Sequence, residues 1–338
     1  MVNPIEPQRT EQLRELTEKI ALEQQIISLL KKEISRTIIG QTDLIDKIIV
    51  ALLCNGHLLL EGAPGLAKTK TIKTVADCLS ASFSRIQFTP DLLPADLTGT
   101  QLFQQKSEKF MVKKGPIFAS FVLADEINRA PAKVQSALLE AMQERQVTIG
   151  EECFPLPAPF LVMATQNPLE HEGTYPLPEA QLDRFMMKVN VEYPSNEEEL
   201  SIIRQFTQPS NATKTEPVLK MEEISGMQKL VNEIYMDEKI ERYIIAIVHA
   251  TRNPTHYKLS DIAPFISFGA SPRGSINLAL TSKAYAFLQG RAFVVPEDVQ
   301  KMAIDVLKHR IGLSYEAEIA NKKSEHIVQQ ILSRIEVP

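Results

Sequence analysis

The sequence predicts an α/β fold in which a parallel sheet sandwiched by helices is followed by an all-helical domain. Short apolar runs at residues 57–61, 120–124 and 160–165 have the length and composition of buried parallel strands. Helical spacing of apolar residues fills segments between such runs, as over residues 132–144. Strands that alternate with helices indicate βαβ units, and the strand pattern stops after residue 193.

The first 37 residues predict a helical arm. Apolar residues recur at helical spacing over residues 10–36, with charged residues between them. Because heptads are not sustained, we expect this helix to pack on the main domain rather than to form a coiled coil. Gly40 interrupts the pattern, and residues 43–54 then predict a short amphipathic helix.

Residues 38–193 carry the predicted α/β core. Its strands are expected at residues 57–61, 84–88, 120–124, 160–165 and 189–192, and its main helices at 69–79 and 132–144.

Residues 194–338 predict a helical lid domain. Ser195 and Glu198 have the spacing of a capping box, which opens a helix through about residue 206. Residues 207–217 are polar with two prolines and predict a loop. Further helical patterns lie near residues 222–235, 238–251, 275–288, 297–308 and 323–335.

Composition argues against several classes of protein. The 338 residues have a net charge of −5, so the Lys/Arg surplus typical of nucleic-acid binding is absent. Three widely spaced cysteines and six scattered histidines show no zinc-ligand spacing or disulfide framework, and we expect the cysteines to be buried and reduced. With no signal peptide and no apolar run near ~20 residues, we expect no membrane span and a cytoplasmic protein.

The strongest motif is a phosphate-binding loop (P-loop) between the strand at 57–61 and the helix at 69–79. Backbone N–H groups of such a loop and the helix N-terminus wrap nucleotide phosphates. Lys68 would reach the β- and γ-phosphates, and the Thr69 hydroxyl would ligate Mg²⁺. Ala67 stands where glycine is usual, and a methyl group is tolerated there if this residue keeps helical backbone angles. The loop residues are Gly62, Ala63, Pro64, Gly65, Leu66, Ala67, Lys68 and Thr69.

Two acids follow the apolar strand at 120–124, as in a Walker B motif. Asp125, at the strand's carboxyl end, can hold the Mg²⁺ shell, and Glu126 can orient and deprotonate the attacking water. Asn167 follows the strand at 160–165, where a polar side chain can hydrogen-bond the γ-phosphate and the lytic water; Asn-Pro is also a common turn pair. Together these motifs predict a protein that binds ATP or GTP.

The order of these motifs, followed by Leu-Asp-Arg-Phe at 182–185 and Ser-Pro-Arg at 271–273, resembles the AAA+ ATPases. Finer features resemble the MoxR family among them: GAPGLAKT at 62–69, RIQFTPDLLP at 85–94, DEINRAP at 125–131 and ATQNP at 164–168. The resemblance is dense over about residues 39–191 and thinner over the lid.

The resemblance implies a role for each matching residue. Asn167 would be sensor 1, Arg184 an arginine finger that points into a neighbour's nucleotide site, and Arg273 sensor 2, acting in cis or in trans. Arg129 is a further candidate to face the neighbour, and Ile39 and Gly40 would pass over the adenine. It also implies ATP and Mg²⁺ as cofactors and a homo-oligomeric ring, usually a hexamer.

The resemblance implies ATP-driven remodelling, maturation or activation of a partner protein, in some members one with a von Willebrand A domain. Predicted hairpins within residues 91–118 and 146–158 are insertions that touch the substrate in similar proteins; the first includes Lys106, Lys109, Lys113 and Lys114. The alternatives are a nucleic-acid-acting ATPase, a chelatase-type subunit and a nucleotide-dependent switch without turnover.

Overall fold

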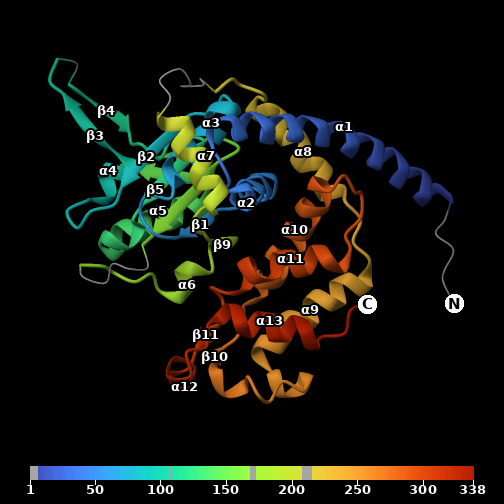
Figure 1. Cartoon of the computed structure of the whole chain (residues 1–338). Coiled ribbons are helices and arrows are strands. Elements are labelled where there is room, and N and C mark those ends of the chain that lie inside the picture. The colour runs from blue at the N-terminus through green and yellow to red at the C-terminus, as the bar shows by residue number, and fades with distance from the viewer. Residues whose placement is uncertain (1–6, 107, 168–172, 208–214) are drawn as a thin grey trace. The chain divides into compact units, whose positions relative to one another are not determined.

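A computed structural model describes residues 7–106, 108–167, 173–207 and 215–338 (Figure 1). Contacts divide the chain into two compact units. One unit contains residues 29–185 and 189–224, and the other contains 186–188, 225–338 and the described residues up to Ser28. The domain boundaries expected at residues 37 and 193 stay a prediction.

A five-stranded sheet forms the centre of the first unit, in the order β2-β5-β8-β1-β9. Met187 and Lys188, at the start of β9, are grouped with the other unit. The pairings β2 with β5, β5 with β8 and β8 with β1 are parallel, as predicted. The strands are β1 (Leu58–Glu61), β2 (Phe83–Gln87), β5 (Phe121–Asp125), β8 (Leu161–Gln166) and β9 (Met187–Asn190).

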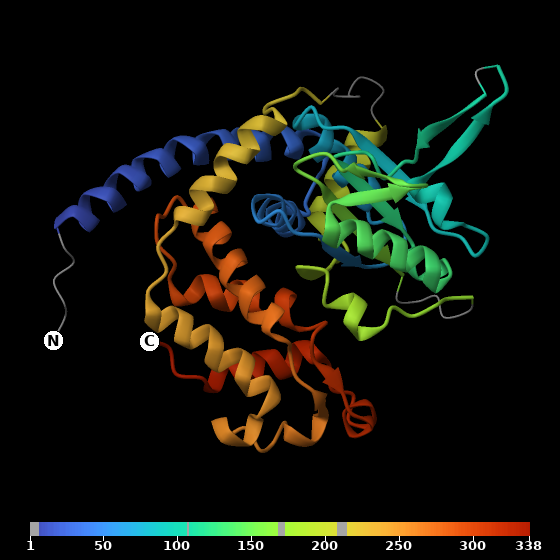
Figure 2. The same ribbon diagram turned by 180° about the vertical axis from the view of Figure 1, so that it is seen from behind.

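The interior strands are buried because helices flank the sheet (Figure 2). Apolar side chains of α5, among them Val134 and Leu138, pack against Val122 of β5 and Val162 of β8. This coverage explains why these strands read as continuous apolar runs instead of alternating patterns. The helices of this unit include α2 (Thr42–Leu53), α3 (Lys68–Cys78), α4 (Pro94–Thr98), α5 (Ala132–Glu144), α6 (Glu179–Leu182) and α7 (Asn196–Thr207), and the long α1 (Pro7–Thr37) enters it at Leu29.

His57 joins three elements of this core. Its ring Nδ1 accepts a hydrogen bond from the Val162 backbone N–H at 3.0 Å, and its Nε2 lies 3.1 Å from the Met142 carbonyl oxygen. Burial, and secondarily the charge of Arg145, lower the pKa of His57 to about 3. A neutral ring with its proton on Nε2 satisfies both contacts, so His57 connects the start of β1 to β8 and α5.

Two antiparallel hairpins extend from this unit, and both were predicted. The first consists of β3 (Gly99–Gln104) and β4 (Lys109–Lys114), and it reaches away from the sheet (Figure 1). The second consists of β6 (Gln146–Ile149) and β7 (Glu152–Pro155). Cys153 lies exposed on β7 and Cys54 is only partly buried, so the prediction of three buried cysteines is right for Cys78 alone.

The predicted capping box is confirmed at the start of α7. The Ser195 backbone N–H donates to Glu198 Oε2 at 2.8 Å, and the Glu198 N–H donates to Ser195 Oγ at 3.4 Å. Within the loop expected at residues 207–217, residues 208–214 lie outside the described part of the chain.

The C-terminal region is helical, as predicted. Its helices are α8 (Met221–Glu233), α9 (Glu238–Arg252), α10 (Pro272–Leu288), α11 (Pro296–Leu307), α12 (Tyr315–Ile319) and α13 (Ser324–Arg334). One detail was not predicted: β10 (Ile266–Phe268) pairs antiparallel with β11 (Gly312–Leu313). Such short strands, far apart in sequence, leave no periodic pattern. Among the described residues, no helix is both long and apolar enough to cross a bilayer.

Candidate functional site

The loop after β1 and the carboxyl ends of β5 and β8 meet at one edge of the sheet and enclose a pocket of about 380 Å³. Ligands of open α/β sheets bind at this edge. The pocket is lined by residues 64–70 of the loop and α3, by Arg85 in the middle of β2, and by residues at or just after the ends of β5 and β8, namely Asp125, Glu126, Thr165, Gln166 and Asn167. The structure thus brings the predicted loop, the acidic pair and Asn167 together.

Lys68 and Thr69 begin α3, so the N-terminus of an 11-residue helix faces this pocket. Ala67 precedes them with φ 54° and ψ 17°, in the left-handed region. Ala67 therefore does not have the helical backbone angles under which we expected its methyl group to be tolerated. The sharp entry from the loop into the helix demands a left-handed residue, a conformation that an L-residue with a Cβ adopts at a cost of about 1–2 kcal/mol.

Lys68 lines the pocket and is partly buried. Its Nζ donates hydrogen bonds to the carbonyl oxygens of Gly62 at 2.6 Å and Ala63 at 3.3 Å. Burial lowers the pKa of Lys68, against the opposing attraction of Asp125 and Glu126. Gly62 and Ala63, the first two residues of the predicted loop, therefore contact Lys68 through their backbone, although neither lines the pocket.

Thr69 and Asp125 line the same pocket. A hydroxyl and a carboxylate are hard oxygen donors, which Mg²⁺ prefers, and it usually takes only one or two protein ligands beside phosphate oxygens and water. The residues present therefore fit a magnesium ion bound together with a nucleotide.

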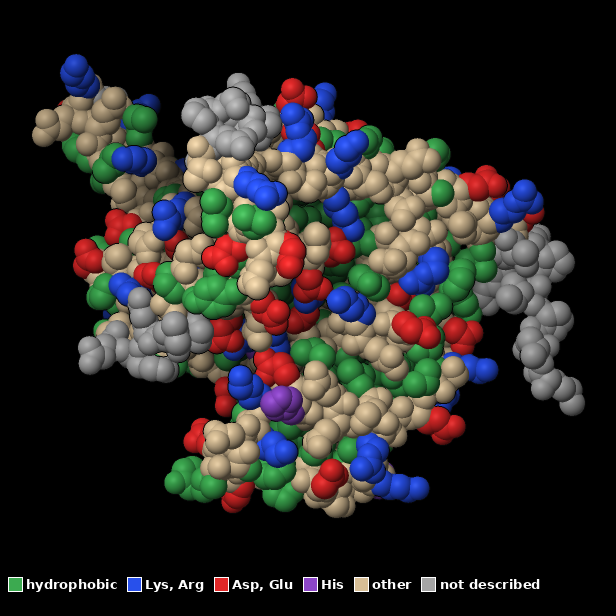
Figure 3. Space-filling view, in the orientation of Figure 1, with side chains coloured by type: hydrophobic (Ala, Val, Ile, Leu, Met, Phe, Trp, Pro, Cys, Tyr) green, Lys and Arg blue, Asp and Glu red, His purple; other side chains and the backbone are tan. Residues whose placement is uncertain are grey.

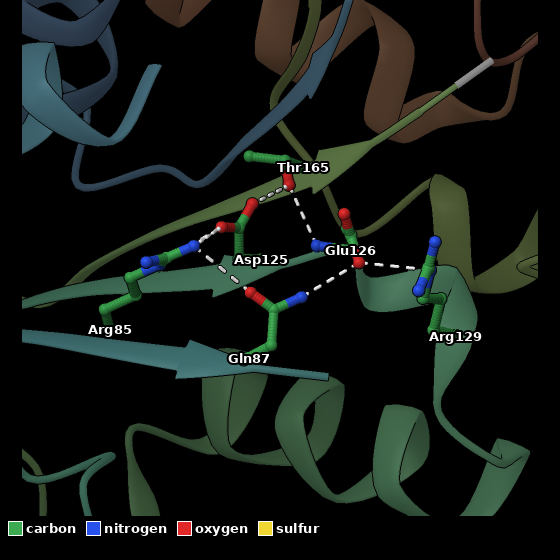
Figure 4. Close-up of polar contacts among 6 residues, drawn as sticks. All are labelled: Arg85, Gln87, Asp125, Glu126, Arg129 and Thr165. Atoms are coloured by element: carbon green, nitrogen blue, oxygen red, sulfur yellow. Dashed lines mark hydrogen bonds and ion pairs between the residues drawn. The ribbon is translucent and has the colours of Figure 1, made fainter. Parts of the chain in front are cut away.

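Thr165, near the end of β8, forms hydrogen bonds with both Asp125 and Glu126 (Figure 4). Its hydroxyl donates to Asp125 Oδ1 at 2.6 Å and accepts from the Glu126 backbone N–H at 2.9 Å. Glu126 itself has φ 56° and ψ 51°, again in the left-handed region. Strain of this kind, of order 1–3 kcal/mol, concentrates at functional sites because surrounding contacts must enforce it.

The Glu126 carboxylate is held from two sides (Figure 4). Gln87 Nε2 donates to its Oε2 at 2.9 Å from β2, and Arg129 Nε lies 3.1 Å from the same oxygen. Arg129, a candidate to face a neighbour, therefore pairs within its own chain here. The carboxylate side chain retains 29% of its exposure, so it faces the pocket while these contacts orient it.

Arg85 pairs with the other acid. Its Nη2 and Nε lie 2.6 and 3.1 Å from Asp125 Oδ2, and Nη2 also donates to Gln87 Oε1 at 3.2 Å. Arg85 and Gln87 are two residues apart, so their side chains lie on the same face of β2. Gln87 is paired with Asp125 in the strand register, and both side chains can therefore contact the end of β5. Their roles were not predicted, because such contacts depend on strand register.

Four predicted residues lie elsewhere. Ile39 and Gly40 line a second pocket of about 350 Å³ beside the end of α1 and the start of α2. Arg184 is partly buried in the turn after α6, outside the residues that line the first pocket. Arg273 belongs to the other compact unit, in the first turn of α10, where its N–H donates to the capping Ser271 Oγ at 3.1 Å.

Comparison with protein families agrees with this architecture. Residues 57–187 match the ATPase family associated with various cellular activities (AAA), and residues 259–331 match the AAA lid domain. The first segment contains the loop, both acids and Asn167, and the second contains Arg273.

Individual relatives extend over most of the chain. The chaperone MoxR1 of Mycobacterium tuberculosis is 47% identical over 307 residues, which is 90% of this chain and 81% of that protein. The protein YeaC of Bacillus subtilis is 44% identical over 91% of this chain and 93% of its own length. A crystal structure of a protein from Cytophaga hutchinsonii superposes with a TM-score of 0.90 at 46% identity, over 95% of this chain and 98% of that one.

Proposed function

This chain belongs to the MoxR family of AAA+ ATPases, and from that membership we propose that it hydrolyses ATP as an oligomeric ring, to remodel, mature or activate partner proteins. The observation that carries the proposal is that one pocket at the edge of the sheet combines the loop, Asp125, Glu126 and Asn167.

In the proposed reaction, water attacks the γ-phosphorus of ATP, the bond to the β,γ-bridging oxygen breaks, and ADP and phosphate leave. The loop N–H groups and Lys68 bind the phosphates, and the helix N-terminus adds its positive dipole. Glu126 accepts the proton of the attacking water, and Asn167 orients that water and the γ-phosphate. Thr69 and Asp125 would hold Mg²⁺, which would supply positive charge to the phosphate oxygens.

The pocket of one chain lacks Arg184 among its lining residues, which supports the action of this arginine on a neighbour's nucleotide. Phosphoryl transfer depends on cations around the transferred group, and an arginine finger can contribute ~10³–10⁵ in rate. A ring in which each Arg184 completes the next site would make turnover depend on assembly. We propose a hexamer on the family resemblance, with Arg273 as sensor 2.

The β3–β4 hairpin supports a protein client. Leu102, Phe103, Phe110 and Met111 are each at least half exposed on it. Lysine and hydrophobic side chains share this projection, as Figure 3 shows at its upper left. Exposed apolar groups beside positive charge suit contact with a polypeptide. On the family resemblance alone, we propose a client that carries a von Willebrand A domain.

The test is the steady-state ATPase rate across protein concentration for wild type, Glu126→Gln and Arg184→Ala, with nucleotide binding measured in parallel. We expect specific activity to rise with concentration and each substitution to abolish it while binding survives. Specific activity that stays flat on dilution to monomer would contradict the ring. Turnover that rises only with added DNA would favour the nucleic-acid alternative.

A further inference from the structure

Arg85 forms an ion pair with Asp125, the carboxylate that is proposed to bind Mg²⁺. Both its Nε and Nη2 contact one oxygen of Asp125, and Thr165 donates to the other oxygen. Each oxygen of Asp125 therefore already accepts a hydrogen bond from the protein. A metal ion that approaches this carboxylate must displace a donor or share an oxygen with it.

We propose that Arg85 is a resident counter-cation of Asp125 that competes with Mg²⁺, and that it thereby sets how strongly nucleotide binding depends on the metal. This inference rests on the proposed function, because it concerns the same nucleotide pocket. Its prediction is about the ratio of two affinities, which is separate from whether the chain turns ATP over.

The ion pair is placed to be exchangeable. The Asp125 side chain is 14% exposed, whereas that of Arg85 is 50% exposed. A mostly buried carboxylate without a cation is costly, so Asp125 requires a positive partner at all times. Arg85 can leave at smaller cost, because a half-exposed guanidinium regains water when the pair opens. Gln87 Oε1, which accepts from Nη2 at 3.2 Å, aims the guanidinium at Asp125.

A displaced guanidinium would stay in the pocket, because Arg85 lines it together with Lys68 and Thr69. Without metal, Arg85 masks the negative charge of Asp125 and reduces its repulsion of the phosphates. With metal, Mg²⁺ takes over this neutralisation. The wild-type site should therefore tolerate metal-free nucleotide better than a site that lacks Arg85.

The experiment compares the dissociation constant of a fluorescent, non-hydrolysable ATP analogue in EDTA with that in excess Mg²⁺. Arg85→Gln removes the charge and keeps a hydrogen-bond donor, and Arg85→Lys keeps the charge without the two-point contact. Lys73→Gln, an exposed position on α3 outside the pocket, is the matched control for loss of one positive charge. Thermal unfolding of each variant verifies that it is folded.

We expect the ratio of the two constants, EDTA over Mg²⁺, to rise at least tenfold in Arg85→Gln, to rise less in Arg85→Lys, and to stay within twofold of wild type in Lys73→Gln. An equal loss of affinity in both conditions would show that Arg85 binds the phosphates directly and would overturn the inference. So would an unchanged ratio.

A double-mutant cycle with Asp125→Asn isolates the pair. In the Asp125→Asn background, Arg85→Gln should change the ratio by less than twofold, because the carboxylate that Arg85 neutralises is gone. A tenfold change that persists there would contradict the inference. If wild type binds the analogue in neither condition, the proposed function fails, which is a different outcome from an unchanged ratio.

Discussion

The strand-end pocket and the β3–β4 hairpin lie in the same compact unit, yet they use their side chains in opposite ways. At the pocket, six residues from β2, β5, β8 and the adjoining turn hold one another by hydrogen bonds and ion pairs (Figure 4). At the hairpin, Phe103 and Phe110 pair with ring centroids 5.2 Å apart and remain more than half exposed.

The two arrangements suit different tasks. Groups fixed by several partners are already oriented for a reaction, which lowers the cost of organising the transition state. Exposed apolar groups on a two-stranded projection gain little within the chain and are available to another one. Substitutions should therefore affect turnover at the pocket and leave both turnover and folding nearly unchanged at the hairpin.

The largest effect is expected from Glu126→Gln. Loss of the general base should lower kcat by about 10²–10⁴-fold, because an amide cannot accept the proton of the attacking water. Gln87 and Arg129 still have a side-chain oxygen to contact, so the fold and nucleotide affinity should survive. Phosphate release under saturating ATP measures the loss, and equilibrium binding serves as its control. Retained turnover would assign the base to another group.

His57, in the core of the same unit, should make the free energy of unfolding depend on pH, and this effect is of intermediate size. His57 has a pKa lowered to about 3 in the folded chain, well below the ordinary value near 6.5. Below pH 6.5 the unfolded chain binds the proton and the folded chain does not, so stability falls as pH decreases. The expected slope is about 1.4 kcal/mol per pH unit, or roughly 2 kcal/mol between pH 6.5 and 5.

Denaturant unfolding of wild type and His57→Gln at several pH values measures this contribution. Glutamine can donate and accept at the same place without titrating. The difference between the two free energies of unfolding should shrink or reverse toward pH 5. Parallel curves over that range would mean that His57 is protonated, or solvated, in the folded state.

The hairpin should respond weakly. Phe103→Ser combined with Phe110→Ser removes an exposed aromatic pair, which is worth about 0.5–1.5 kcal/mol at most. Basal turnover should stay within about twofold of wild type, since surface changes away from a site act weakly on it. Phe88→Ala is the contrasting variant, because Phe88 is fully buried and its truncation should cost about 3–5 kcal/mol. A comparable cost for the hairpin variant would show that these rings are part of the folded core.

The smallest effect is expected at Ala67. Because Ala67 has φ 54°, Ala67→Gly should relieve backbone strain and stabilise the fold by about 0.5 kcal/mol, after the greater entropy of glycine in the unfolded chain is subtracted. Ala21→Gly, at an exposed position inside α1, should instead cost about 1 kcal/mol. Equal destabilisation by both substitutions would mean that Ala67 is not strained.

The same comparison explains which parts could be predicted from the sequence. The strands β1, β5 and β8 were predictable because buried parallel strands are continuous apolar runs, and their polar end residues marked the edge of the pocket. The two hairpins were predictable from their turn residues and strand propensity.

Other features could not be predicted from local sequence patterns. The contacts of Arg85 and Gln87 with the two acids depend on the register of β2 beside β5, which no single segment specifies. Thr165 looked like one more residue of a buried strand. The left-handed backbone angles of Ala67 and Glu126 are set by the direction in which the chain leaves each strand and enters the next turn. Neither alanine nor glutamate favours these angles.

Under the proposed function, a working site is shared between copies of the chain, with Glu126 from one copy and Arg184 from its neighbour. Mixing Glu126→Gln with Arg184→Ala tests it most directly, because each variant alone lacks one half of every site. In rings assembled from an equal mixture, about a quarter of the interfaces would join an intact Glu126 to an intact Arg184. We predict that ATP turnover reappears on mixing, toward that fraction of the wild-type rate. A mixture as inactive as its two components, while still assembling, would contradict the shared site.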